Sequence, residues 1–225
     1  MAETLRYVGE IMPFLLQGTL IMIELFVLTL LFSLPLGLPV TLGSTCRFKV
    51  VRFICKCFIW IFRGTPLLLQ LFFFFYMLPI ISDGAISLGP FPTAVIVFVL
   101  NYAAYFAEIY RGGMNSIDSG QYEAAHSLGL NKHQTMMGII VPQTFRVVLP
   151  PVTNEAIVLI KDTALVSCIG VGDLMRNSKG FVSRDVNLTA YIIAAAIYLI
   201  FTYMMTRLSA YLEKRVSEYD SKGEW

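Results

Sequence analysis

Two acidic side chains stand inside an apolar stretch, where their charges could hold a cation. Glu155 and Asp162 lie in the segment 147–170, which is otherwise apolar apart from Asn154 and Lys161. In a helix, an interval of seven residues is two turns, so both carboxylates project from one face, about 10 Å apart along the axis. Ionisable groups within a bilayer are costly and usually face a cavity or a partner. The pair predicts an acidic lining that attracts a guanidinium, ammonium or imidazolium group.

These acids also have a structural interpretation. Lys161 points roughly 100° away from the acidic face and could neutralise a neighbouring acid. Either Glu155 or Asp162 could instead hydrogen-bond to a helix end, or pair with Lys161 or Arg63. Both interpretations stay open at the level of the sequence.

The residue types do not predict catalysis, a metal site or a cofactor. Four cysteines, Cys46, Cys55, Cys57 and Cys168, have neither metal-ligand nor CxxC spacing. We interpret them as small apolar side chains. The net charge of +2 is small and the basic residues are dispersed, so nucleic acid is not an expected partner.

The elements that position these side chains are predicted to be membrane-spanning helices. The 225 residues are 56% hydrophobic and only 14% charged, whereas a soluble domain has about 25% charged residues. A spanning helix needs about 20 apolar residues, and five segments meet that requirement: 11–45, 53–81, 91–109, 147–170 and 188–211. Glu24 is the one ionisable residue of the first segment, and we expect it to be buried and to join helices. The whole chain, 1–225, is predicted to be one all-α transmembrane domain.

Basic residues in short loops predict the orientation of these spans. The link between the first two spans, with the start of the second, contains Arg47, Lys49, Arg52 and Lys56 and no acid. Arg207, Lys214, Arg215 and Lys222 lie at the end of the last span and after it. The N-terminus is therefore expected outside and the C-terminus in the cytoplasm. One external loop disagrees, because it contains Arg176, Lys179 and Arg184.

A segment that does not span, 118–133, is predicted to be a cytoplasmic or interfacial helix. Asp118 and Gln121 have the spacing of a capping box at its start. Ala124 and Ala125 would present a nearly flat surface, and Gly129 would end or kink the helix while allowing close backbone approach. A partner could pack against such a surface, although an ordinary amphipathic connector on lipid headgroups is the alternative.

Three motifs resemble a known family. The stretch AAYFAEIYRGGMNSIDSGQYEAAHSLGLNKHQTMMGIIVPQ closely resembles the EAA loop of permease subunits of bacterial ABC importers. FRGTPLLLQLF, at 62–72, and LPPVTNEAIVLIKDTALVSCIG, at 149–170, look like the second and fourth spans of its polar amino-acid branch. The similarity covers about residues 18–211. It implies an ABC type I importer permease, close to the arginine/histidine/glutamine type, with five transmembrane helices and a cytoplasmic coupling helix.

The resemblance implies a set of partners in the bacterial plasma membrane. In the family, the cytoplasmic helix docks in a cleft on the ATP-binding subunit and transmits its closure to the spans. The docking residues carried over are Glu123, Ala124, Ala125 and Gly129. The chain has no G-x-x-x-x-G-K-[ST] phosphate loop, so the permease is not an enzyme and requires a separate ATPase. A second permease subunit, identical or homologous, and an external substrate-binding protein complete the expected importer.

The expected cargo is a polar amino acid, first of all arginine, lysine or histidine. Glu155 and Asp162 are the candidate cation site, Arg63 could meet the α-carboxylate or pair with an acid, and pairing is favoured. Gln70, Asn101 and Tyr105 could contact the α-groups or join helices. The alternatives are a neutral polar cargo such as glutamine, since KDT-type sequences also occur in permeases for neutral amino acids, an ion-coupled carrier, and a non-transporting scaffold.

Overall fold

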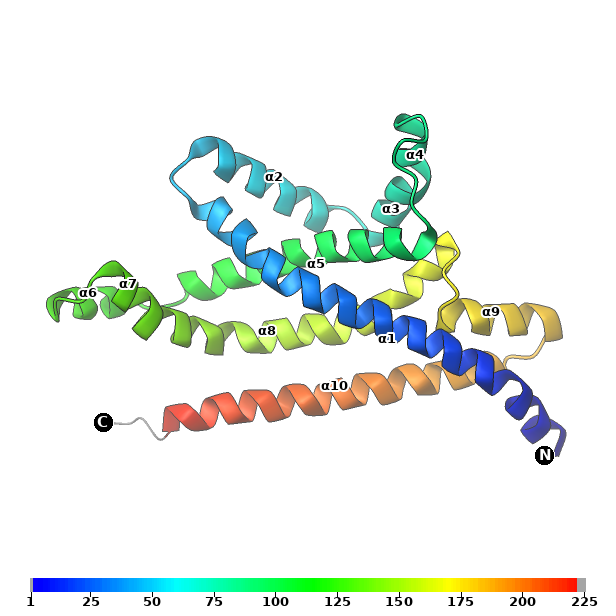
Figure 1. Ribbon diagram of the computed structural model, residues 1–225. Helices are drawn as coiled ribbons and strands as arrows, with labels where there is room; N and C mark the ends of the chain where they lie inside the picture. The colour runs from blue at the N-terminus through cyan, green and yellow to red at the C-terminus, as the bar shows by residue number, and fades with distance from the viewer. Residues whose placement is uncertain (1, 222–225) are drawn as a thin grey trace.

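The computed structural model describes residues 2–221, and every regular element in this range is a helix. Lys222, which was counted for the orientation, lies outside the described residues. Four long helices run alongside one another: α1 (Ala2–Thr45), α5 (Pro90–Asn115), α8 (Val141–Asp162) and α10 (Thr189–Ser221) (Figure 1). The connection from α1 to α2 lies toward the same end as α6 and α7, whereas α9 lies at the opposite end (Figure 1).

The long helix α1 packs closely along α5. It contains three prolines, Pro13, Pro35 and Pro39, yet remains one helix of 44 residues. A Cβ atom added at Gly37 would lie 3.0 Å from Phe106 Cβ, so the absent side chain lets the two helices approach. The Thr41 hydroxyl donates to the carbonyl of Ala107 at 2.9 Å. This contact fixes the position of α5, which forms the centre of the bundle.

The segment predicted as one span, 53–81, is two helices at a sharp angle. α2 (Lys49–Gly64) is followed by α3 (Leu67–Phe72), the π-helical turn η1 (Phe73–Met77) and α4 (Leu78–Ile81). The two parts meet at 107°. The cause of the break is Pro66, because the residue before a proline is driven out of the helical region, and Thr65 is extended with ψ 145°.

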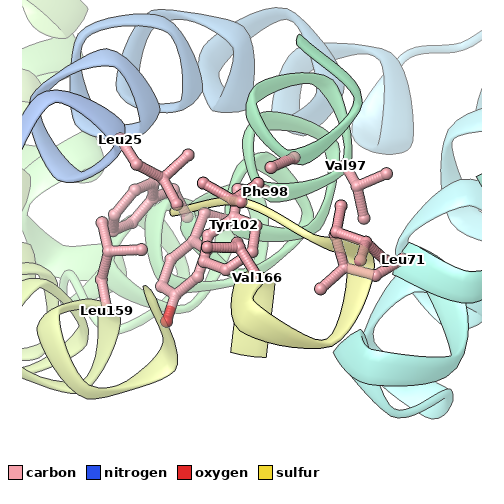
Figure 2. Close-up of a cluster of buried hydrophobic side chains, with 11 residues drawn as sticks. Leu25, Leu71, Val97, Phe98, Tyr102, Leu159 and Val166 are labelled. Carbon is pink, nitrogen blue, oxygen red and sulfur yellow. The ribbon is translucent and has the colours of Figure 1, made fainter. Parts of the chain in front are cut away.

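The main hydrophobic core surrounds α5. Phe98 and Tyr102 of α5 pack with Leu25 of α1, Leu71 of α3 and Leu159 of α8, as Figure 2 shows. Each of these side chains is at most 2% exposed. The core thus holds together the helices that contribute to the candidate site.

The end of α8 and the segments after it form a second packed region. α8 continues as a 3-10 helix, η3 (Thr163–Ile169), which ends at Gly170 with a left-handed φ of +93°. The segment after Gly170 contains one short helix, α9 (Leu174–Asp185). Leu174 packs with Ile11 and Leu15 of α1 and Ala190 of α10.

Length and composition identify fewer spans than the five predicted. In the described part of the chain, the ranges Glu3–Thr45, Pro90–Asn115 and Thr189–Val216 are long and apolar enough to cross a membrane, and the bent pair of 49–64 and 67–81 gives a fourth. The span predicted at 147–170 corresponds to α8 and η3 and is not among them. Its prolines and its polar and charged side chains lower the mean hydropathy of α8.

The single helix predicted at 118–133 is wrong in extent. α6 (Ser119–Ser127) ends at Leu128, and α7 (Lys132–Thr135) begins after Asn131. Gly129 ends α6 with φ +72°, and the Leu130 amide donates to the Ala125 carbonyl at 3.0 Å. Asp118 is the N-cap as expected, but it accepts from the Gly120 amide. The complete capping box lies instead at Asn131 and Gln134.

Candidate functional site

A cavity of about 680 Å³ lies where the α2–α3 break meets α5 and α8. Five of the six residues predicted to contact substrate line it, namely Arg63, Asn101, Tyr105, Glu155 and Asp162. They come from three helices that are far apart in the sequence. The structure therefore brings these predicted side chains to one place, whereas Gln70 lies behind the wall.

The acidic side of the cavity belongs to α8. Glu155 and Asp162 are both half-buried and line the same space, as the seven-residue interval predicts. The Tyr102 hydroxyl donates to Asp162 Oδ2 at 2.8 Å. Lys161 is exposed and does not line the cavity. Among the described residues, neither carboxylate makes an ion pair with Lys161 or Arg63.

The basic side of the cavity belongs to the end of α2. Arg63 Nη1 lies 3.7 Å from Glu108 Oε1, and the Arg63 guanidinium lies 5.3 Å from the ring centre of Tyr105. Arg111 also pairs with Glu108, through Nε and Oε2 at 3.0 Å and through a second, shorter contact. Arg63 thus pairs with an acid, and that acid is Glu108, which the sequence did not single out.

Two buried amides hold the break between α2 and α3. The Gln70 amide nitrogen donates to the Phe62 carbonyl at 2.9 Å and to Thr65 Oγ1 at 2.8 Å. The Asn101 amide nitrogen donates to Gln70 Oε1 at 3.0 Å and to the same Phe62 carbonyl at 3.0 Å. Both side chains join helices, which is the structural alternative predicted for them. They fix where the Arg63 end of α2 sits relative to α5.

Comparison with known proteins decides the family. Residues 33–218 match the family described as "Binding-protein-dependent transport system inner membrane component". The chain belongs to this family.

Several relatives are permease proteins of amino-acid transport systems. The L-cystine transport system permease protein TcyB of Bacillus subtilis is 37% identical over 212 residues, which cover 93% of this chain and 89% of that protein. The arginine transport system permease protein ArtQ of the same organism is 35% identical over 209 residues, with 92% and 94% covered. A putative glutamine transport system permease protein GlnP of Rickettsia typhi is 33% identical over 216 residues, with 94% and 98% covered.

Solved structures agree with this assignment. The crystal structure of an amino acid ABC transporter with histidines has a chain that is 32% identical, covers 95% of this chain and 97% of its own length, and gives a TM-score of 0.86. A chain of the MetNI methionine ABC transporter is 15% identical with a TM-score of 0.70, which supports the fold alone. This protein is thus the membrane-embedded permease subunit of a polar amino-acid ABC importer with a type I permease fold. Like its relatives it is not the ATPase, since ATP hydrolysis is carried out by a separate subunit.

The permease exposes only part of the surface predicted for the segment 118–133, which corresponds to α6 and α7. Glu123, Ala124 and Gly129 are exposed in α6 and at its end. Ala125 is 1% exposed, so the expectation that it forms part of the exposed flat surface is wrong: it packs inside the chain. Leu128, 77% exposed, is the apolar side chain that the sequence reading missed. A large apolar residue just before a terminal glycine is the signal that could have found it.

Tyr102 is the third residue, after Glu108 and Leu128, that sequence reasoning missed. A tyrosine in an apolar helix is typical of a core position, and Tyr102 is indeed only 2% exposed. Its hydroxyl nevertheless reaches Asp162 in the cavity wall. Its position could have indicated this contact. Tyr102 lies one helical turn before Phe106 and directly after Asn101, on the face of α5 that packs against α8.

Proposed function

We propose that this permease moves basic L-amino acids, with arginine, lysine and histidine as the first candidates. The observation that carries the proposal is the charge arrangement of the 680 Å³ cavity: Glu155 and Asp162 on the α8 wall and Arg63 on the α2 wall. A basic amino acid carries a cationic side chain and an α-carboxylate, and these two groups complement the two walls.

Arg63 and Tyr102 have distinct roles in this proposal. The Arg63 side chain is 38% exposed and shares Glu108 with Arg111, so it keeps donors free for an α-carboxylate. Tyr102 is a positioning residue, since its hydrogen bond orients Asp162. Tyr105 stacks under the Arg63 guanidinium and limits how far that group can move.

A second permease copy, identical or homologous, completes the pathway in our proposal. Glu24 was expected to be buried, but in the single chain it is exposed on α1. Leu20 and Leu31, on the same helix, are 66% and 60% exposed. An ionisable group in such a span is tolerated against a partner or a water-filled cavity rather than against lipid. Glu24 therefore supports a partner helix on this face.

The remaining parts of the proposal concern topology and coupling. α8 with η3 acts as the fifth span, shielded from lipid by its neighbours and by the second permease, with the N-terminus outside and the C-terminus cytoplasmic. A separate ATPase subunit docks on α6 through Glu123, Ala124, Gly129 and the newly identified Leu128. A substrate-binding protein delivers the amino acid from outside, and alternating access carries it past Glu155 and Asp162.

A neutral polar cargo such as glutamine is the second candidate. The named relatives at 33–37% identity differ in substrate, and they include cystine and glutamine systems. In addition, Tyr102 already hydrogen-bonds to one of the two acids. Asp162 could therefore be a structural acceptor in a permease for neutral amino acids.

The experiment is uptake into liposomes by the permease reconstituted with the subunits that co-purify. A tightly bound ATPase and ATP-dependent uptake support the importer, whereas uptake driven by an ion gradient alone would contradict it. Glu155→Gln should weaken arginine and lysine uptake more than glutamine uptake. Glu10→Gln, which removes an exposed acid at the N-terminal end of α1, is the matched control. An equal loss for all three amino acids would contradict charge selection.

A further inference from the structure

A second cavity, of about 790 Å³, lies between α2 and the ends of α1 and α5 that point toward α6 (Figure 1). Its walls contain four basic side chains, Arg52, Lys56, Arg63 and Arg111, and one acid, Glu108. The formal charge of the walls is therefore +3. Because the acid is already paired with Arg111 and Arg63, it does not neutralise the other two cations.

Arg52 and Lys56 are the available cations of this cavity. Within the described part of the chain, neither side chain has an ion pair or a side-chain hydrogen bond. They are four residues apart on α2, and Arg63 follows seven residues later, so all three project from one helical face. A stripe of guanidinium and ammonium groups that lines a cavity and lacks a counter-charge fits an anion.

The opposite face of α2 is apolar and uncovered. Val50, Ile54 and Ile61 are 71%, 59% and 48% exposed. An amphipathic helix at a membrane normally turns its basic face to water and its apolar face to the acyl chains. In this chain the basic stripe of Arg52, Lys56 and Arg63 faces α1 and α5 across the cavity. The apolar face on the other side of α2 is left exposed, so the basic cavity lies next to a surface that suits acyl chains. Trp60, at the edge of the cavity and 76% exposed, suits the headgroup level, where tryptophan is enriched.

A close helix contact holds the stripe in place. A Cβ atom added at Gly43 of α1 would lie 2.5 Å from Cys55 Sγ of α2. Only a glycine lets α2 fold back so near to α1, and Ser44, the next residue, is 2% exposed in the cavity wall. The cavity is therefore a built feature of the α1–α2 hairpin rather than a gap beside a free helix.

We propose that this basic cavity binds the phosphate group of an anionic membrane lipid, with Arg52 and Lys56 as its principal ligands. The acyl chains then lie along the apolar face of α2. The cavity is separate from the acidic one, although Arg63 and Gly64 line both. A lipid seated here holds α2, and with it the Arg63 end that faces the acidic cavity. The proposal does not depend on which amino acid is transported.

The test titrates the permease, purified with the subunits that accompany it, with phosphatidylglycerol and with phosphatidylcholine and counts bound lipid by native mass spectrometry. Phosphatidylglycerol should bind more tightly. Arg52→Gln and Lys56→Gln should each weaken it about tenfold, the usual effect of losing one charge-assisted hydrogen bond. Lys179→Gln is the matched control, since Lys179 is an exposed lysine of α9, at the opposite end of the bundle, that does not line the cavity (Figure 1).

Two further arms make the outcome decisive. Lys56→Arg should retain binding, which separates loss of charge from loss of folding. Inorganic phosphate is added as a competitor of the lipid. Displacement of the lipid that depends on Arg52 and Lys56 would support the phosphate site and show that free phosphate can also occupy it. Equal binding of the two lipids, or equal weakening by Lys179→Gln, would overturn the proposal.

Discussion

The acidic and the basic cavity share Arg63 and Gly64 but differ in every other charged side chain. In the acidic cavity the two acids come from one helix, α8, where Glu155 and Asp162 lie two turns apart. In the basic cavity three of the four cations come from α2, an amphipathic helix joined to α3 at a 107° bend, and the fourth, Arg111, comes from α5 with its partner Glu108. In our proposals the two helices therefore have different roles. α8 selects the cargo, while α2 binds a membrane lipid and positions Arg63 between the two cavities.

The largest effect is expected from removing both acids of the α8 wall. The double substitution Glu155→Gln with Asp162→Asn should lower arginine uptake about a hundredfold, because two charge-assisted contacts are lost at about tenfold or more each. Glutamine uptake should fall much less. Transport assays in liposomes measure both, and a glutamine loss as large as the arginine loss would show that the acids act structurally.

Arg63→Gln should have the next largest effect, and it should not discriminate by side-chain charge. Uptake of arginine and glutamine should fall together by between about tenfold and a hundredfold, because in the proposed site Arg63 meets the α-carboxylate that both amino acids possess. The ratio of the two uptake rates is the measurement. A selective loss of arginine would place Arg63 in the side-chain pocket instead.

A smaller effect is expected at the buried contact behind the acidic wall. Tyr102→Phe removes one hydrogen bond to Asp162 and keeps the ring, so the KM for arginine should rise about threefold to tenfold with little change in thermal stability. Tyr110→Phe is a control of the same kind on the same helix, where the hydroxyl donates to the Leu34 carbonyl at 3.2 Å outside the acidic cavity. Identical KM changes in both variants would assign Tyr102 a packing role only.

A third carboxylate, Asp173, should affect stability alone. It is fully buried at the start of α9, where it accepts from the Met175 and Arg176 amides at 3.1 and 3.0 Å. Burial raises the pKa of Asp173 to about 6. The folded state therefore binds a proton more readily than the unfolded state between about pH 4 and 6, so stability is higher at acid pH and falls as the pH rises through this range.

The contribution of Asp173 changes the free energy of unfolding by at most about 1.4 kcal/mol per pH unit. Thermal unfolding of the wild type should show this trend between pH 4 and 6, and Asp173→Asn should flatten it while uptake stays near the wild-type value. A trend that persists in Asp173→Asn would assign the pH dependence to other groups.

Local patterns in the sequence predicted which side chains line the acidic cavity better than they predicted where the helices begin, bend and end. Glu155, Asp162 and Arg63 were identified because charged residues in apolar segments stand out whatever the tertiary structure. The break before Pro66 and the end of α6 at Gly129 were also predictable, since both follow from the backbone of one or two residues. The docking roles of α6 and the substrate contacts remain predictions.

Long-range contacts account for what the sequence did not predict. The 107° bend needs the Gln70–Asn101–Phe62 network, which joins residues 31 and 39 positions apart. Ala125 is buried by contacts with other segments, which the pattern of its own helix does not predict. Tyr102 is of a residue type that is common in cores, yet its hydroxyl reaches Asp162 on α8. The sequence predicted a span at 147–170, but α8 is not among the described helices that are long and apolar enough to cross a membrane, because its prolines and its polar and charged side chains lower its hydropathy.

The most direct test of charge selection compares arginine with citrulline, which has nearly the same shape and no charge on its side chain. ATP hydrolysis by the reconstituted importer, measured without a binding protein over a range of free amino-acid concentrations, reports on the membrane cavity itself. We expect arginine to stimulate hydrolysis at a concentration at least about tenfold lower than citrulline, and Glu155→Gln to abolish this difference. Equal stimulation by the two amino acids in the wild type would contradict an acidic cavity that selects its cargo by charge.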